Sequence, residues 1–414
     1  MFKNSMIYTL SSILSAGIPF LLLPVLTRYL SPEQYGQIAM FHIFVVALAG
    51  IIGLSVHGAA NRQFFVDNIT SFDLARFNGN CFFILLGSSS FMLIFLTFID
   101  TYLADYLGIP PAWIYLGVLS VFCFFILNIR LGQWQVRGQA KVYGFFQVVN
   151  ALIVLSSSLL FVIYFNLGPE GRIYGIVITS VIIGFCSYYS LRNDNRVLFE
   201  YNRKDINDAL SFGVPLVPHV LGGFLLLSVD RLIINKELGL EMTGIYMVAF
   251  SLGSALNIIF SSINRAFSPW LFGQLKEGDE DMKIKIIQKT YAYFLFLILL
   301  SLLSFYIAPP LFKLIVGEQF HQAANILPFI IVGQVFLGMY FMVTNYIFYV
   351  KKTKYLSYVT VSSGVINVAL LFLLIPSYGI LGAALAFLVA NFCQFICTWI
   401  VSAKLYNMPW GLRK

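Results

Sequence analysis

Long stretches without a single Asp, Glu, Lys or Arg dominate this 414-residue chain. Most have about the length of the roughly 20 apolar residues that cross a bilayer as a helix. The last is about twice as long and is interrupted by Pro376 and Gly379, which predicts a helical hairpin. The stretches cover residues 7–27, 36–60, 77–99, 106–129, 142–169, 173–191, 209–229, 242–264, 290–312, 319–350 and 355–403. Eleven stretches, one of them a hairpin, predict twelve membrane spans.

The composition excludes a soluble core of ordinary size, since 59% of the residues are hydrophobic and only 11% are charged. Lipid offers backbone N–H and C=O groups no hydrogen-bond partner, so each span must satisfy its own backbone as a helix. A closed sheet would instead need alternating segments of about ten residues. The fold class is therefore expected to be all-α, a polytopic membrane protein with about twelve transmembrane helices.

The distribution of basic residues predicts the orientation. If the N-terminus lies in the cytoplasm, 21 of the 26 Lys and Arg residues fall on the inner side of the membrane. The remaining five are Arg28, Arg172, Arg231, Lys236 and Lys313. Such a bias follows the positive-inside rule, and it predicts a multi-pass protein of the cell inner membrane with both termini cytoplasmic. The net charge of +8 then reflects topology and contact with membrane lipids, and nucleic acid is not implied.

A parallel repeat is expected to relate two six-helix lobes, residues 1–191 and 209–414, joined by a cytoplasmic linker at 192–208. Two pairs of arginines carry the signal, because Arg28 precedes Arg62, and Arg231 precedes Arg265, by the same 34 residues. Both pairs end in an Asn-Arg-x-Phe run. Parallel repeats about an axis along the membrane normal are typical of alternating-access transporters, with substrate bound between the lobes.

Catalytic motifs are missing from the sequence. It contains no G-x-S-x-G elbow, no P-loop and no H-E-x-x-H, and the outer connections are too short for a catalytic domain. We therefore expect a protein that is not an enzyme and needs no cofactor. The five cysteines lie in predicted helices without accompanying His or carboxylate, so we expect them to pack as small apolar residues and to bind no metal.

The four repeated arginines are the candidate substrate-binding residues. Arg28, Arg62, Arg231 and Arg265 cap predicted spans, and a guanidinium fork suits the paired oxygens of a phosphate. Each alone could equally be an anchor that extends to the membrane interface. Their symmetric placement favours the binding role.

Two further residues are candidates for ion coupling. Asp230 adjoins Arg231 and is either its ion-pair partner or a protonatable group. His57 lies near the inner end of the second span, where it could relay protons or simply pack. The sequence leaves both alternatives open.

The N-terminal segment resembles a known family. The run L-T-R-Y-L-S-P-E-x-Y-G, Leu26 to Gly36, is similar to the start of Wzx-type O-antigen flippases of the multidrug/oligosaccharidyl-lipid/polysaccharide exporter superfamily. The resemblance implies a flippase that moves oligosaccharide linked to undecaprenyl diphosphate, such as an O-antigen unit, from the cytoplasmic to the periplasmic leaflet. It also implies a polysaccharide polymerase and a chain-length regulator as partners. Transport would be driven by a proton or sodium gradient, or by consumption of product outside.

Two other function classes are alternatives to a flippase. A multidrug or cation antiporter of the same superfamily is the alternative, but members of that kind often place a carboxylate within the first helix, which this chain lacks. An oligosaccharide polymerase or ligase would need large outer loops. The outer connections at residues 100–105 and 230–241 are short.

Overall fold

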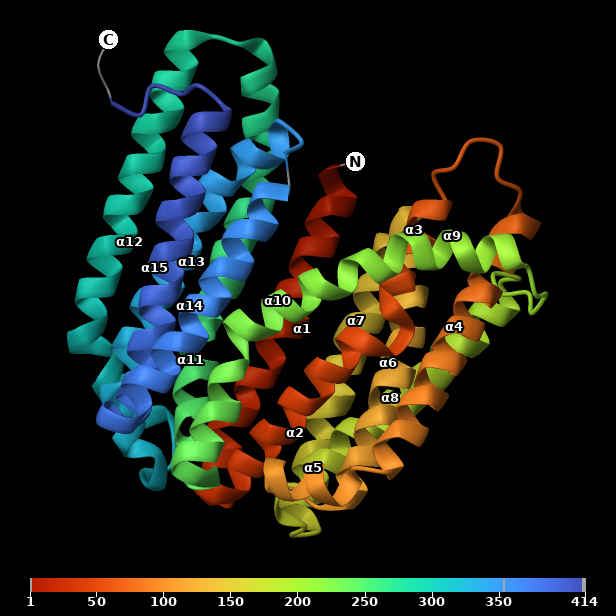
Figure 1. Cartoon of the computed structure of the whole chain (residues 1–414), viewed down its shortest axis with the longest axis horizontal. Coiled ribbons are helices and arrows are strands. Elements are labelled where there is room, and N and C mark those ends of the chain that lie inside the picture. The colour runs from red at the N-terminus through yellow and green to blue at the C-terminus, as the bar shows by residue number, and fades with distance from the viewer. Residues whose placement is uncertain (1, 353, 412–414) are drawn as a thin grey trace. The chain divides into compact units, whose positions relative to one another are not determined.

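The computed structural model describes residues 2–352 and 354–411, and within them every regular element is a helix. The first part of the chain forms α1 (Phe2–Tyr29), α2 (Pro32–Ile51), η1 (Ile52–Ser55), α3 (Val56–Gln63), α4 (Ser71–Thr97), α5 (Asp100–Leu107), α6 (Pro111–Val136), α7 (Ala140–Leu159), η2 (Leu160–Tyr164), α8 (Gly168–Asn193), α9 (Arg203–Gly213), η3 (Val214–Leu216) and α10 (Val217–Leu227). The second part forms α11 (Val229–Glu277), α12 (Glu280–Ile315), η4 (Glu318–Asn325), α13 (Leu327–Tyr349), α14 (Lys354–Tyr378) and α15 (Ile380–Leu405) (Figure 1). The all-α prediction is confirmed.

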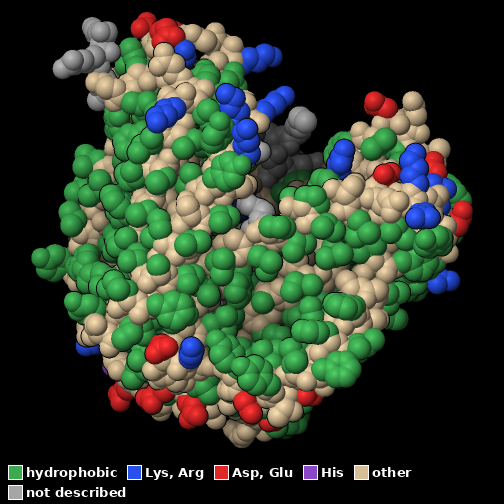
Figure 2. Space-filling view, in the orientation of Figure 1, with side chains coloured by type: hydrophobic (Ala, Val, Ile, Leu, Met, Phe, Trp, Pro, Cys, Tyr) green, Lys and Arg blue, Asp and Glu red, His purple; other side chains and the backbone are tan. Residues whose placement is uncertain are grey.

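Twelve helical segments of the described chain are long and apolar enough to cross a membrane, which confirms the predicted number. They run from Met6–Tyr29 to Ile380–Leu405, and three of them join elements across a break, as α2, η1 and α3 do in Pro32–Gln63. Figure 2 shows hydrophobic side chains over most of the helix sides and charged side chains gathered near helix ends. This is the distribution that a protein surrounded by lipid requires.

The chain divides into two compact units. Unit 1 contains residues 1–22 and 33–224, and unit 2 contains residues 23–32 and 225–414. The C-terminal part of α1 thus packs with unit 2, and α9 and most of α10 pack with unit 1. The lobe boundary expected at residues 192–208 stays a prediction.

The core of unit 1 is built around α6, which packs against α8 and α3. Leu127, Leu131 and Trp134 of α6 form a buried apolar cluster with Ile183 of α8. Large aromatic residues of α7 cover this cluster, among them Phe146, whose ring centroid lies 5.1 Å from that of Trp134. Removal of these side chains from solvent and lipid fixes the positions of α6 to α8, which carry several arginines considered below.

The core of unit 2 is built around α13, which packs against α15, α11 and α12. Phe260 of α11, Phe294 of α12, Val335 of α13 and Phe395 of α15 meet in one buried cluster. The end of α1 joins this unit because the Gly317 N–H donates to Thr27 Oγ1 at 3.1 Å. A Cβ at Gly317 would lie 2.1 Å from the Thr27 carbonyl oxygen, so only glycine permits this approach.

The seventh span is interrupted by a short 3₁₀ turn. α9 ends at Gly213, a 3₁₀ turn follows at Val214–Leu216 with Pro215 in it, and α10 continues from Val217. The five cysteines are all free thiols: Cys81 and Cys123 are buried, Cys393 is half-buried, and Cys186 and Cys397 are exposed.

Candidate functional site

A buried ion pair lies at the start of α11. Asp230 is 1% exposed and Arg231 is 3% exposed. One oxygen of Asp230, Oδ1, accepts hydrogen bonds from the Arg231 backbone N–H at 3.0 Å and from its Nη1 at 2.8 Å. The other, Oδ2, accepts the Tyr246 hydroxyl at 2.6 Å. The charges therefore neutralise each other inside unit 2, and both carboxylate oxygens are engaged.

The Arg231 guanidinium has further contacts within the same unit. Its Nη1 also donates to the Leu227 carbonyl, and its Cζ lies 3.7 Å from the centroid of the Phe250 ring. Its Nε is buried without a hydrogen-bond partner among the described residues. An arginine held in this way is not available to a ligand while the pair stays closed. Its role in substrate binding stays a prediction.

The other three arginines of the repeat are exposed. Arg28 lies in the last turn of α1, and Arg62 lies in the last turn of α3. Arg62 Cζ lies 5.6 Å from the centroid of the Phe212 ring in unit 1. Arg265 makes only long contacts, 3.4 Å, to Ser261 of its own helix α11. Among the described residues, none of these three guanidinium groups pairs with a carboxylate.

The second span is broken between α2 and α3. Gly53, Leu54 and Ser55 all adopt positive φ angles, 75°, 47° and 57°. A Cβ at Gly53 would lie 2.1 Å from the Phe125 ring, so glycine is required there, and its N–H donates to Ser88 Oγ at 2.8 Å. Left-handed backbone at two non-glycine residues is unfavourable and persists only when the surrounding packing imposes it.

His57 follows this break at the start of α3. Its ring packs edge-to-face on Phe125, with the centroids 5.5 Å apart. Its Nδ1 is buried and has no hydrogen-bond partner among the described residues. His57 lies in unit 1, and the Asp230–Arg231 pair lies in unit 2. The coupling role of both stays a prediction.

Two buried or half-buried arginines of unit 1 were not predicted as candidates. Arg130 is 3% exposed, pairs with Asp194 and lies 4.2 Å from the centroid of the Trp134 ring. Arg172 donates to Ser158 Oγ at 2.5 Å. The sequence places both arginines at span ends. It does not predict their burial by α7 and α8, because that burial depends on packing between distant segments. The sequence shows only that both adjoin charge-free stretches, Arg130 after residues 106–129 and Arg172 before residues 173–191.

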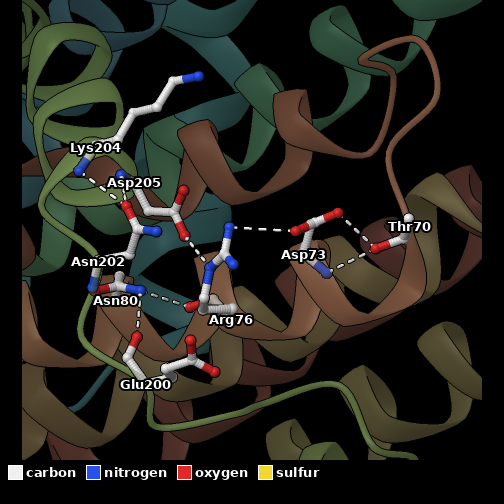
Figure 3. Close-up of polar contacts among 8 residues, drawn as sticks. All are labelled: Thr70, Asp73, Arg76, Asn80, Glu200, Asn202, Lys204 and Asp205. Carbon is white, nitrogen blue, oxygen red and sulfur yellow. Dashed lines mark hydrogen bonds and ion pairs between the residues drawn. The ribbon is translucent and has the colours of Figure 1, made fainter.

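A polar network fixes the start of α9 to α4 (Figure 3). Arg76 Nε donates to Asp205 Oδ2 at 2.9 Å, and Asn80 Nδ2 donates to the Glu200 carbonyl at 2.9 Å. The Asn202 N–H in turn donates to Asn80 Oδ1 at 2.9 Å. Because side chains of α4 bond the backbone on both sides of residue 201, the segment before α9 is held on unit 1.

Comparison with known sequences identifies the family. Residues 1–274 match the family described as "Polysaccharide biosynthesis protein". The chain is 27% identical over 400 residues to "Lsg locus putative protein 1" of Haemophilus influenzae, covering 92% of this chain and 95% of that protein. It is 24% identical to "Putative O-antigen transporter" of Shigella flexneri, covering 87% and 88% of the two chains.

Solved structures show the same fold. The inward-facing conformation of a multidrug resistance MATE family transporter of the MOP superfamily superimposes with a TM-score of 0.73 at 14% identity, covering 97% of this chain and 94% of the other. The outward-facing conformation of such a transporter gives a TM-score of 0.63 at 15% identity. The match over residues 1–274 shows that this chain belongs to the polysaccharide biosynthesis protein family.

Proposed function

We propose that this protein is a flippase that moves oligosaccharide linked to undecaprenyl diphosphate from the cytoplasmic to the periplasmic leaflet by alternating access. The observation that supports this most directly is the similarity, over 87% of the chain, to a protein named as an O-antigen transporter. Such a substrate is an O-antigen unit or a similar repeat of a surface polysaccharide. A polymerase and a chain-length regulator of the same polysaccharide are the proposed partners.

The proposed substrate needs cationic partners for its diphosphate, while its prenyl tail can stay in lipid. Exposed Arg28, Arg62 and Arg265 can supply guanidinium groups, each giving about 1.5–3 kcal/mol when it hydrogen-bonds a charged oxygen away from water. Arg231 would join them only if its pair with Asp230 opens. We therefore propose that the three exposed arginines can bind the diphosphate while the Asp230–Arg231 pair is closed. Arg231 binds it only after that pair has opened.

The ion pairing of the buried acidic residues disfavours the alternative of a cation antiporter. An organic cation needs a carboxylate that is free within the membrane. Among the described residues the buried acids are Asp205 and Asp230, and both are ion-paired, to Arg76 and Arg231. The described part of the chain therefore contains no unpaired buried carboxylate that could bind an organic cation.

Coupling to a proton or sodium gradient is proposed to involve Asp230 and His57. Protonation of Asp230 would remove the counter-charge of Arg231 and so release its guanidinium to a substrate phosphate. Asp230→Asn would then abolish any dependence of transport on pH or sodium. Unchanged gradient dependence in this variant would leave Asp230 with a purely structural role.

The proposed location is the cell inner membrane with both termini cytoplasmic, as the basic residues predict. Reporter fusions after Glu200, Gly278 and Lys352 should all give a cytoplasmic signal. A periplasmic signal at any one of them would contradict this orientation.

Complementation tests the proposed function. The protein is expressed in a strain that lacks its own O-antigen flippase but makes the matching lipid-linked unit, and surface glycan is measured together with membrane abundance. Restored glycan is the expected result. If the protein is abundant but restores no glycan, and instead lowers the sensitivity of an efflux-deficient strain to organic cations, the antiporter alternative replaces the flippase.

A further inference from the structure

A cavity of about 320 Å³ in unit 2 combines one cation with aromatic and apolar walls. It lies between α11, α12 and α13, and its lining includes Phe267, Trp270, Lys289, Tyr293 and Met342. Two other cavities, of about 280 Å³ and about 400 Å³, are lined without any charged side chain. The charge is thus what distinguishes this cavity from the apolar grooves that any membrane protein offers to lipid tails.

Lys289 sits at the boundary between the polar and apolar parts of α12. Residues 290–312, which follow it, contain no Asp, Glu, Lys or Arg, so Lys289 marks the level of the lipid headgroups. Its Nζ lies 5.5 Å from the centroid of the exposed Trp270 ring. Within the described chain no carboxylate pairs with Lys289. Lys289 is exposed, so its ammonium group is accessible to a ligand and has no counter-charge within the described chain.

Tyr293 lies one helical turn further into the apolar part of α12. Its hydroxyl is buried and has no hydrogen-bond partner among the described residues. A buried hydroxyl without a partner is unfavourable, and an acceptor bound in the cavity would satisfy it. Lys289 and Tyr293 thus line the cavity together with the apolar side chains of Phe267 and Met342.

We propose that this cavity binds the headgroup of an anionic phospholipid from the surrounding membrane. The phosphodiester would accept from Lys289 Nζ and from the Tyr293 hydroxyl, and an acyl chain would lie along Phe267 and Met342. A single cation balances the single charge of a phosphodiester, whereas a diphosphate would leave excess negative charge. The leaflet is the cytoplasmic one if the predicted orientation holds, and the inference does not depend on the transported substrate.

The test is native mass spectrometry of the full-length protein titrated with phosphatidylglycerol or phosphatidylcholine. Loss of a charge-assisted contact of about 1.5–3 kcal/mol predicts that Lys289→Gln weakens the tightest phosphatidylglycerol site by about tenfold or more. Tyr293→Phe, which removes only the hydroxyl, should weaken it by about two- to tenfold. Lys285→Gln is the matched control, because exposed Lys285 lies one turn earlier on α12 and does not line the cavity. It should bind as the wild type does.

Equal affinity of the wild type for phosphatidylcholine would overturn the proposal, since the ammonium would then recognise no net charge. Equal losses in Lys285→Gln and Lys289→Gln would also overturn it, because they would indicate diffuse attraction of anionic lipid to a basic surface. Displacement of phosphatidylglycerol by a stoichiometric amount of a short-chain prenyl diphosphate would assign the cavity to the transported lipid instead. Wild-type affinity of Tyr293→Phe would show that the Tyr293 hydroxyl does not contact the bound phospholipid.

Discussion

Arg28 and Arg231 occupy matching places in the repeat but have opposite environments. Arg28 is exposed in the last turn of α1, whereas Arg231 is 3% exposed at the start of α11. The residue before each arginine accounts for the difference. Asp230 gives Arg231 a buried counter-charge, while Thr27 gives Arg28 none and instead donates to the Leu23 carbonyl at 2.8 Å.

This comparison shows that one neighbouring residue can decide what a repeated arginine does. An arginine can be buried in a membrane protein only with a partner that offsets its desolvation. With Asp230 beside it, Arg231 becomes part of the core of unit 2. Without an acid beside it, Arg28 keeps its guanidinium accessible.

The largest effect is expected from Asp230→Ala. Removing the acid leaves the Arg231 charge buried without compensation, which should destabilise the protein by about 3–5 kcal/mol. Thermal unfolding of the purified protein in lipid nanodiscs measures the change. Asp208→Ala is the matched control, because Asp208 is exposed on α9, and it should leave stability nearly unchanged.

The double variant Asp230→Ala with Arg231→Ala sharpens this result. Removing both charges should recover part of the stability lost in the single variant, because no unpaired charge then stays buried. A double variant that is as unstable as the sum of the two single variants would show that the pair is not coupled.

A smaller effect is expected from Tyr246→Phe. The Tyr246 hydroxyl donates to Asp230 Oδ2 at 2.6 Å, and hydrogen bonds to charged groups contribute about 1.5–3 kcal/mol. The ring itself stays, so packing against Phe250 is kept. Unfolding in the same nanodiscs should show a loss within this range. A loss below about 0.5 kcal/mol would mean that Arg231 alone holds the carboxylate.

The smallest effect on stability is expected from a substitution of Thr27, the residue before Arg28. Thr27→Val keeps the shape of the side chain but removes the acceptor of the Gly317 N–H, which should lower stability by about 1 kcal/mol. Chemical denaturation followed by tryptophan fluorescence can resolve such a change. A loss as large as that of Asp230→Ala would contradict the distinction drawn between the two arginines.

The twelve helices could be predicted from the sequence because a bilayer requires long charge-free segments whatever the tertiary packing. The pair Asp230–Arg231 was visible as two neighbouring residues, but its burial was not, since Tyr246 and Phe250 close over it only once α11 has turned back at Gly239. No proline lies between residues 33 and 63, and the break at Gly53 depends on Phe125 of another helix. Local patterns could not indicate either feature.

The most direct test of the account is complementation by alanine and lysine variants of the repeated arginines, with membrane abundance measured for each. Alanine at Arg28, Arg62 or Arg265 should remove most glycan assembly at normal abundance, and lysine should keep part of it because it retains charge but not the bidentate fork. Arg231→Ala should instead lower abundance. If Arg28→Ala, Arg62→Ala and Arg265→Ala all restore glycan to wild-type levels, the exposed arginines do not bind the substrate.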